Sequence, residues 1–179
     1  MKDNIILIGF MGSGKTSVGI RLSYALKRTM IDTDKWIEKK NGMTVSEIFA
    51  KQGEKEFRRM ETDCIRGFIE NENHQIISTG GGLPVREENH ALLKELGRVY
   101  YLKAAPETVY ERLKGDTTRP LLQGDDPMSK IKELLSMRAP LYEKCADVII
   151  DVSGKNFDTI IEEIVRKERQ NENTHYQRT

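Results

Sequence analysis

A glycine-rich segment near the N-terminus constrains the fold of this chain more than any other feature. Residues 9–16 read Gly-Phe-Met-Gly-Ser-Gly-Lys-Thr and satisfy the pattern G-x-x-x-x-G-K-[ST]. The apolar run 4–8 precedes this segment, and apolar residues at helical spacing follow it. This strand–loop–helix context is typical of a phosphate-binding loop, because its glycines let several backbone N–H groups point at one anion beside a helix N-terminus. A dinucleotide-binding turn is disfavoured, because Ser17 stands where the third glycine should be.

The same segment predicts the residues that hold ATP. The Lys15 side chain is expected to reach the β- and γ-phosphates, and the Thr16 hydroxyl is expected to ligate Mg²⁺. The predicted ATP-binding residues of the loop are Gly12, Ser13, Gly14, Lys15, Thr16 and Ser17.

The rest of the chain alternates short apolar runs with helical patterns. This alternation predicts βαβ units in a three-layer α/β fold, with a five-stranded, mostly parallel sheet and helices on both faces. Ligands in such folds gather at the carboxyl ends of the strands. We expect one domain over residues 1–179. The expected strands cover residues 4–8, 29–31, 75–78, 99–102 and 147–151.

Three further segments depart from this regular alternation or carry candidate side chains. Residues 33–62 hold candidate acceptor-binding groups, and we interpret them as a substrate-binding segment. Residues 114–127 are polar, contain glycine and lack period, which predicts a mobile lid. A helix is expected to resume through Arg138, and a closing helix to cover residues 157–165. Residues 167–179 turn polar without period and are expected to fray.

Composition narrows the possible partners. Lys plus Arg total 29 against 28 for Asp plus Glu, so the net charge of +1 favours neither nucleic acid nor a membrane as the main partner. No apolar run is long enough to span a bilayer, and no secretory signal is recognised. Cys64 and Cys145 lie far apart without metal-ligand spacing, which favours two reduced thiols. We therefore expect a cytoplasmic protein.

Two aspartates are candidates for work on the phosphate acceptor. Asp32 and Asp34 end the second expected strand, and a period of two places them on the same side of it. One carboxylate could hold Mg²⁺ through water, and the other could accept the proton of an attacking hydroxyl. The alternative is that Asp34 only caps the helix that begins near Lys35.

Arginines and a glycine run complete the set of candidates. Arg58, Arg119 and Arg138 could each contact an anion, but an isolated arginine is more often a solvated surface charge. Arg119 lies in the expected lid, where it could fold onto the phosphates. Gly80, Gly81 and Gly82 follow a buried strand and would let a substrate approach backbone N–H groups; a flexible turn is the alternative.

As an ordered set, these segments resemble the shikimate kinase family, a branch of P-loop folds like the nucleoside-monophosphate kinases. The resemblance extends from about residue 4 to about residue 165, and only the phosphate loop is generic. The matching segments are residues 9–16, Asp32-Thr-Asp34, Gly53-Glu-x-x-Phe-Arg58, Ser78-Thr-Gly-Gly-Gly82, Arg119-Pro-Leu-Leu122 and Arg138-x-Pro-x-Tyr142.

The resemblance implies transfer of the γ-phosphate of ATP to shikimate, giving ADP and shikimate 3-phosphate on the route to chorismate and aromatic amino acids. Catalysis is implied for Lys15, Asp34 and Arg119, and Mg²⁺ binding for Thr16 and Asp32. The implied substrate-binding residues are Asp34, Arg58, Gly80, Gly81, Gly82 and Arg138.

The resemblance also implies an adenine contact by Arg112, with Lys155 nearby. This chain has Phe157 where the family often has proline. A monomer is expected. The alternatives are another small-metabolite kinase such as gluconate kinase, a nucleoside-monophosphate kinase, and a non-catalytic ATP-binding protein or switch.

Overall fold

The computed structural model describes residues 2–115 and 126–176, and they fold around one parallel sheet. Its strand order is β2-β3-β1-β4-β5, and all four pairings are parallel. The predicted α/β fold with a five-stranded sheet is confirmed. The strands are β1 (Ile5–Ile8), β2 (Met30–Asp32), β3 (Ile76–Ser78), β4 (Arg98–Lys103) and β5 (Val148–Asp151).

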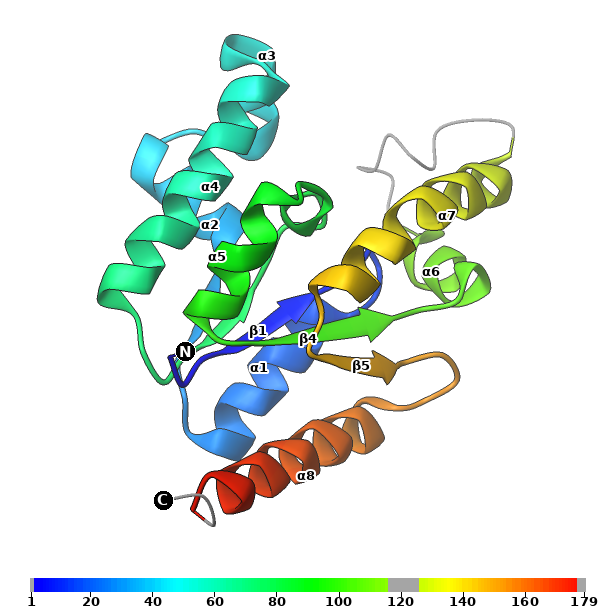
Figure 1. Cartoon of the computed structure of the whole chain (residues 1–179). Helices are drawn as coiled ribbons and strands as arrows, with labels where there is room; N and C mark the ends of the chain where they lie inside the picture. The colour runs from blue at the N-terminus through cyan, green and yellow to red at the C-terminus, as the bar shows by residue number, and fades with distance from the viewer. Residues whose placement is uncertain (1, 116–125, 177–179) are drawn as a thin grey trace.

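Helices cover both faces of this sheet (Figure 1). On one face α1 (Lys15–Leu26) packs against α8 (Phe157–Tyr176), and on the other lie α5 (Glu88–Leu96) and α7 (Pro127–Cys145). Helix α4 (Glu54–Asn71) packs on α5 and on α3. The remaining elements are α2 (Thr33–Asn41), α3 (Val45–Gln52), the 3₁₀ turn η1 (Leu83–Val85) and α6 (Pro106–Leu113).

The central strand is the most buried part of the sheet. All four residues of β1 are fully buried, as a parallel strand covered on both faces must be. The edge strands differ: β2 is half-buried, and β5 alternates buried and exposed residues. The carboxyl end of β1 therefore lies in the middle of the ligand edge, between the ends of β3 and β4.

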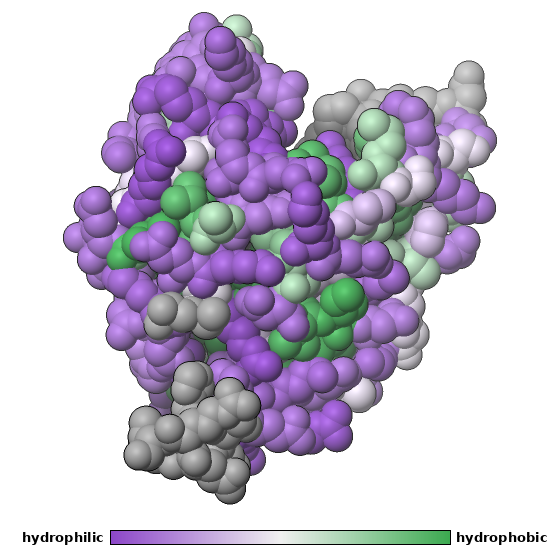
Figure 2. Space-filling model, viewed as in Figure 1, coloured by the Kyte–Doolittle hydropathy of each residue, from purple (hydrophilic) through white to green (hydrophobic). Residues whose placement is uncertain are grey.

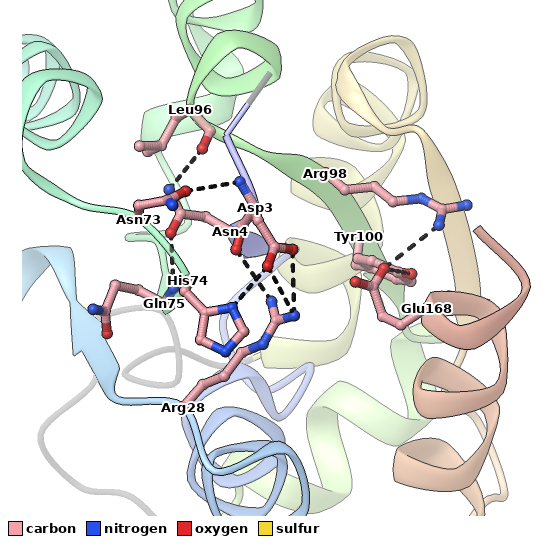
Figure 3. Close-up of polar contacts among 10 residues, drawn as sticks. All are labelled: Asp3, Asn4, Arg28, Asn73, His74, Gln75, Leu96, Arg98, Tyr100 and Glu168. Carbon is pink, nitrogen blue, oxygen red and sulfur yellow. Dashed lines mark hydrogen bonds and ion pairs between the residues drawn. The ribbon is translucent and has the colours of Figure 1, made fainter. Parts of the chain in front are cut away.

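Two helices are longer than the sequence predicts. Helix α7 does not end at Arg138 but continues through Pro140 to Cys145. The expected fraying from residue 167 is wrong as far as Tyr176, because α8 continues to that residue. One reason is tertiary: the buried Glu168 accepts a hydrogen bond from Tyr100 Oη at 2.5 Å and pairs with Arg98 at 3.5 Å (Figure 3).

Local signals in the sequence were accurate elsewhere. Thr44 and Glu47 form the predicted capping box at the start of α3, with the Glu47 N–H donating to Thr44 Oγ1 at 3.2 Å. Gly97 ends α5 as expected. In the described ranges, 2–115 and 126–176, no helix combines the length and the apolar character needed to cross a membrane.

A buried asparagine joins three segments at the amino ends of the strands (Figure 3). Asn4 is 2% exposed; its Nδ2 donates to the carbonyl oxygens of Glu72 (3.2 Å) and Leu96 (2.8 Å). Its Oδ1 accepts from the Gln75 N–H at 2.8 Å. Asn4 thereby satisfies backbone groups that the ends of α4 and α5 and the start of β3 would otherwise bury unpaired.

We predict that Asn4→Ala lowers the free energy of unfolding by about 2–4 kcal/mol, because buried backbone groups lose their partners. Chemical denaturation measures the change. The Michaelis parameters of the folded variant should match those of the wild type, since Asn4 lies at the opposite end of the strands from the ligand edge. A loss below about 0.5 kcal/mol would show that the side chain is not structurally important.

Candidate active site

The phosphate loop joins β1 to α1 and places a cation inside its curve. Gly14 precedes α1 with φ 96°, a left-handed conformation that glycine adopts without strain. Gly14 contributes no side-chain cap to the N–H groups of the first turn, which point to the side where a helix N-terminus favours an anion. Lys15 is 9% exposed, and its Nζ donates to the carbonyl oxygens of Gly9 (2.8 Å) and Phe10 (3.0 Å). Thr16 is exposed beside this loop.

The two aspartates after β2 have different roles in the structure. Asp32 caps α2: its Oδ1 accepts from the N–H groups of Asp34 (3.0 Å) and Lys35 (3.1 Å). Asp34 is therefore not the cap, and its side chain turns toward the glycine run. Its Oδ1 is buried without a hydrogen-bond partner among the described residues. Burial and the neighbouring Asp32 charge raise the pKa of the Asp34 carboxyl, while Lys15 and Arg58 oppose that rise.

The glycine run after β3 lies against these groups without intervening side chains. A Cβ at Gly80 would sit 2.5 Å from Asp34 Oδ1, and one at Gly81 would sit 3.6 Å from the N of Met11 in the phosphate loop. A Cβ at Gly82 would fall on the Arg58 guanidinium. At Gly80 and Gly82 glycine thus permits a close approach of these side chains rather than an unusual φ, whereas a Cβ at Gly81 would make only ordinary contacts.

The backbone of this run is fixed by side chains from other elements. The Gly80 N–H donates to the buried Thr33 Oγ1 at 2.9 Å. This N–H is therefore not available to a substrate, contrary to the expectation from the sequence. The Tyr142 hydroxyl donates to the Gly81 carbonyl at 2.7 Å. Among the described residues, the N–H groups of Gly81 and Gly82 have no partner. These two donors are the ones that a ligand can use.

Arg58 presents its guanidinium between two carboxylates of its own helix. Its Nη1 donates to Glu61 Oε2 at 2.8 Å, and its Nη2 donates to Glu54 Oε1 at 3.1 Å. Glu61 is 1% exposed, and its Oε1 has no partner among the described residues. Burial raises the pKa of Glu61 to about 7, although the Arg58 charge and hydrogen bond oppose that rise.

Arg138 approaches the same region from α7. It is half-buried, with its guanidinium carbon 5.6 Å from the centre of the Phe10 ring. Burial raises the pKa of Tyr142 to about 12, and the charges of Arg138 and Arg58 oppose that rise. Arg58 and Arg138 therefore converge on the Tyr142 hydroxyl and the glycine run that it contacts.

The predicted nucleotide residues lie on the other side of the phosphate loop. Arg112 Nη1 donates to the carbonyl oxygens of Gly12 (3.2 Å) and Ser13 (2.9 Å). Its guanidinium carbon lies 5.7 Å from the centre of the Phe157 ring. Lys155 pairs with Glu163 on α8 at 2.8 Å. Arg119 and most of the expected lid lie outside the described residues.

The described residues fit a metal that is held mainly by phosphate and water. They contain no group of three or more His, Cys, Asp or Glu side chains that could hold an ion. Mg²⁺ in phosphoryl-transfer sites commonly takes one or two protein ligands and fills its shell with phosphates and water. Thr16, at the start of α1, and Asp32, whose Oδ1 is used as a helix cap, are the protein oxygens proposed for that role.

These elements surround a hollow on the molecular surface. Figure 2 shows a notch between the lobe that carries α3 and α4 and the lobe that carries α7. Arg58 comes from the first lobe and Arg138 from the second.

Four residues of this region were not predicted from the sequence as site residues. Thr33, Glu61, Asn89 and Tyr142 are all buried, and each contacts the glycine run, Arg58 or the turn that follows. Glu61 and Asn89 could have been found, because each is a polar residue on the apolar stripe of its helix. A polar group is buried at such a position only when it has a hydrogen-bond or ion-pair partner. Thr33 and Tyr142 lie inside the matching motifs but carried no predicted role.

The fold and this arrangement define a P-loop kinase for a small acceptor. Comparison with known proteins narrows the class. The family model for shikimate kinase matches residues 11–169, so this chain belongs to the shikimate kinase family. The predicted family and enzyme class are therefore confirmed.

Individual relatives agree with the family assignment. A shikimate kinase of Thermodesulfovibrio yellowstonii is 47% identical over 92% of this chain and 94% of its own length. The solved shikimate kinase of Acinetobacter baumannii in complex with shikimate superposes with a TM-score of 0.86 at 36% identity, covering 96% of this chain and 95% of that one. A gluconokinase of Sinorhizobium meliloti, with a TM-score of 0.61 and 17% identity over 98% and 97% of the two chains, shares the fold alone.

We predict a pH dependence of stability that comes from Glu61. Its pKa is about 7 in the folded protein against 4.5 ordinarily, so the folded state binds the proton more tightly. The Glu61 contribution to the free energy of unfolding is therefore favourable at low pH and falls as pH rises from about 4.5 to about 7. Denaturant titrations of the wild type and Glu61→Gln at several pH values measure the difference.

The difference between the two proteins should decline across that window and become constant above about pH 8. The Asp34 charge contributes to the raised pKa of Glu61, so the difference between the two proteins includes that coupling. A difference that stays level across the window would contradict the raised pKa.

Proposed function

We propose that this protein transfers the γ-phosphate of ATP to the 3-hydroxyl of shikimate, giving ADP and shikimate 3-phosphate. The family assignment supports the reaction. The observation in the structure that carries the proposal is the Asp34 Oδ1 atom, which is buried against Gly80 and has no hydrogen-bond partner among the described residues. The charges of Lys15 and Arg58 act on this carboxyl and lower its pKa against the effect of burial. This carboxylate is thus influenced by both Lys15 of the phosphate loop and Arg58.

Asp34 is the proposed base for the attacking hydroxyl. Its raised pKa moves it toward neutral pH, which suits proton transfer. As the hydroxyl oxygen bonds to the γ-phosphorus, the bond from that phosphorus to the bridging oxygen of ADP breaks. The hydroxyl proton passes to Asp34. Lys15 and the N–H groups at the start of α1 stabilise the charge that spreads over the transferring phosphoryl group.

Arg58 and Arg138 are the proposed carboxylate ligands. Guanidinium groups pair with a carboxylate through two parallel hydrogen bonds, which fixes its orientation as well as its position. The N–H groups of Gly81 and Gly82, which have no partner among the described residues, are proposed to contact the acceptor, and Gly82 lies against the Arg58 guanidinium. A ring that carries one carboxylate and several hydroxyls matches these donors.

The remaining proposals concern the nucleotide and its setting. Mg²⁺, with Thr16 and Asp32 as protein ligands, would neutralise charge on the β- and γ-phosphates. Arg112 and Lys155 are proposed to lie at the nucleoside, and Arg119 to close over the phosphates. We further propose a cytoplasmic monomer in aromatic amino acid biosynthesis.

A substrate panel separates this proposal from its alternatives. We predict ADP release with ATP, Mg²⁺ and shikimate, and little or none with gluconate or AMP as acceptor. AMP has no carboxylate for the two arginines, and gluconate carries its carboxylate and hydroxyls on a flexible open chain rather than on a ring that presents them together to the arginines and Asp34. A coupled ADP assay measures all three. Turnover with gluconate above that with shikimate would redirect the assignment. Tight ATP binding without turnover of any acceptor would favour the non-catalytic alternative.

Asp34→Asn tests the base. Asparagine has the same shape but cannot take the proton, so we expect kcat to fall by about 10²-fold or more. The Kd for ATP, measured by calorimetry, should change little because the phosphate loop is intact. An unchanged kcat would leave Asp34 with an orienting role only.

Arg58→Ala tests the carboxylate site, and its neighbour supplies a matched control. Loss of charge-assisted hydrogen bonds worth about 1.5–3 kcal/mol should raise KM for shikimate by about 10- to 10²-fold. Arg59 lies one position along α4, with its side chain 64% exposed and paired with Glu56 and Asp63. Arg59→Ala should leave KM unaltered. Equal effects of the two substitutions would contradict the assignment.

A further inference from the structure

The buried Asn89 bridges two walls of the acceptor site. Asn89 on α5 is 0% exposed. Its Oδ1 accepts from Thr62 Oγ1 at 2.9 Å, and its Nδ2 donates to the carbonyl oxygen of Leu83 at 2.9 Å. Thr62 lies one helical turn after Arg58 on α4, and Leu83 directly follows Gly82.

The chemistry of the bonded groups determines which atom donates in each hydrogen bond of the bridge. A carbonyl oxygen only accepts hydrogen bonds, so the amide NH₂ of Asn89 must face Leu83 and the amide oxygen must face Thr62. The Thr62 hydroxyl has a single proton; its contact with Asn89 at 2.9 Å is shorter than that with the Arg58 carbonyl at 3.2 Å. Thr62 therefore donates to Asn89, and the chain from α4 to the turn is continuous.

Asparagine is an unfavourable choice for this position on packing grounds alone. It lies on the inner side of α5 with His90, Leu93 and Leu96, where an apolar side chain would bury more favourably. Asparagine also has a low helix propensity. The two hydrogen bonds are what make its burial tolerable, and both lead to the acceptor site.

The bridge adds a hydrogen-bonded restraint to the packing that holds the helix of Arg58. The carboxylates that hold the Arg58 guanidinium, Glu54 and Glu61, belong to α4 itself. They orient the guanidinium on its helix but do not fix the helix relative to the glycine run. Among the side-chain hydrogen bonds of the described residues, only the link through Asn89 joins α4 to the turn after that run.

The distance between α4 and the glycine run, which this link spans, is short. A Cβ at Gly82 would overlap the Arg58 guanidinium, so helix and glycine run are already in contact. The Gly82 N–H and the Arg58 guanidinium are two of the proposed donors to one acceptor molecule. A small shift of α4 would change the distance between them and misalign both hydrogen bonds.

We propose that Asn89, through Thr62, is a positioning residue for the acidic acceptor. It holds the Arg58 guanidinium at the distance from the Gly82 N–H that a carboxylate-bearing ring requires. The inference rests on the proposed function, because it concerns affinity for that acceptor. Asn89 itself touches neither substrate.

The test uses Thr62, where a mild substitution is available. Thr62→Val keeps the shape and removes the hydroxyl, whereas Thr62→Ser keeps the hydroxyl. We expect Thr62→Val to raise KM for shikimate by about 3- to 10-fold, the effect of one hydrogen bond, while kcat and KM for ATP stay within about twofold. Thr62→Ser should restore KM to near the wild-type value.

Two controls separate positioning from general destabilisation. Tyr100→Phe removes a buried hydrogen bond to Glu168 on α8, on the opposite face of the sheet, and should lower Tm without raising KM. In the Arg58→Ala background, Thr62→Val should have no further effect on KM, because the group that it positions is gone.

The outcomes are distinct. An unchanged KM in Thr62→Val, or an equal rise in the Arg58→Ala background, would overturn the positioning role while leaving the proposed function intact. Equal rises in the KM values for shikimate and ATP would identify a purely structural effect and would also overturn it. Failure of the wild type itself to phosphorylate shikimate would remove the proposed function, and the inference with it.

Discussion

The acceptor half of the site depends on how the backbone after β3 is fixed. Side chains from three helices form hydrogen bonds with this backbone. Thr33 Oγ1 accepts from the Gly80 N–H, the Tyr142 hydroxyl donates to the Gly81 carbonyl, and Asn89 Nδ2 donates to the Leu83 carbonyl. A trans peptide is planar, with its N–H and C=O pointing in opposite directions. Because Tyr142 fixes the Gly81 carbonyl, the Gly82 N–H of the same peptide points the opposite way. Side chains in the second layer thus determine which backbone donors remain available.

Charge in this region is balanced before any ligand binds. Asp34 and Glu61 are buried carboxyls whose pKa values are raised by burial. Arg58 opposes both rises, and Lys15 opposes the rise at Asp34. An arriving carboxylate would meet Arg58 already engaged by Glu61. A proton on Glu61 reduces that competition. The raised pKa of Glu61 therefore matters for the acceptor site as well as for stability.

The sequence predicted those features that depend on neighbours in the chain. The phosphate loop, the capping box at Thr44 and the helix after it all follow from local patterns. Whether Asp32 or Asp34 caps α2 could not be predicted, because the two residues are two positions apart and the first residue of a helix is defined only to within one or two residues. The continuation of α8 to Tyr176 depends on contacts of Glu168 with β4, about seventy residues away in sequence.

Thr33, Asn89 and Tyr142 were not predicted as site residues for the same reason, because their partners are distant in the sequence. The contacts of Thr33 with Gly80, Thr62 with Asn89 and Tyr142 with Gly81 span 47, 27 and 61 residues. Periodicity shows that such a side chain faces inward but not which partner it meets. The arginines were easier to select, because an ordered set of motifs carried them together.

The strand order explains why donor and acceptor residues separate along the sheet. β1 is central, so its phosphate loop divides the carboxyl edge into two halves. β2 and β3 lie on one side and deliver Asp34 and the glycine run, whereas Arg112 and Phe157 follow β4 and β5 on the other. Arg138 is the exception, since α7 follows α6 in the chain but packs against η1. The Tyr142 contact with Gly81 holds α7 in that position, so Arg138 can serve a half of the site that its own strand neighbours do not form.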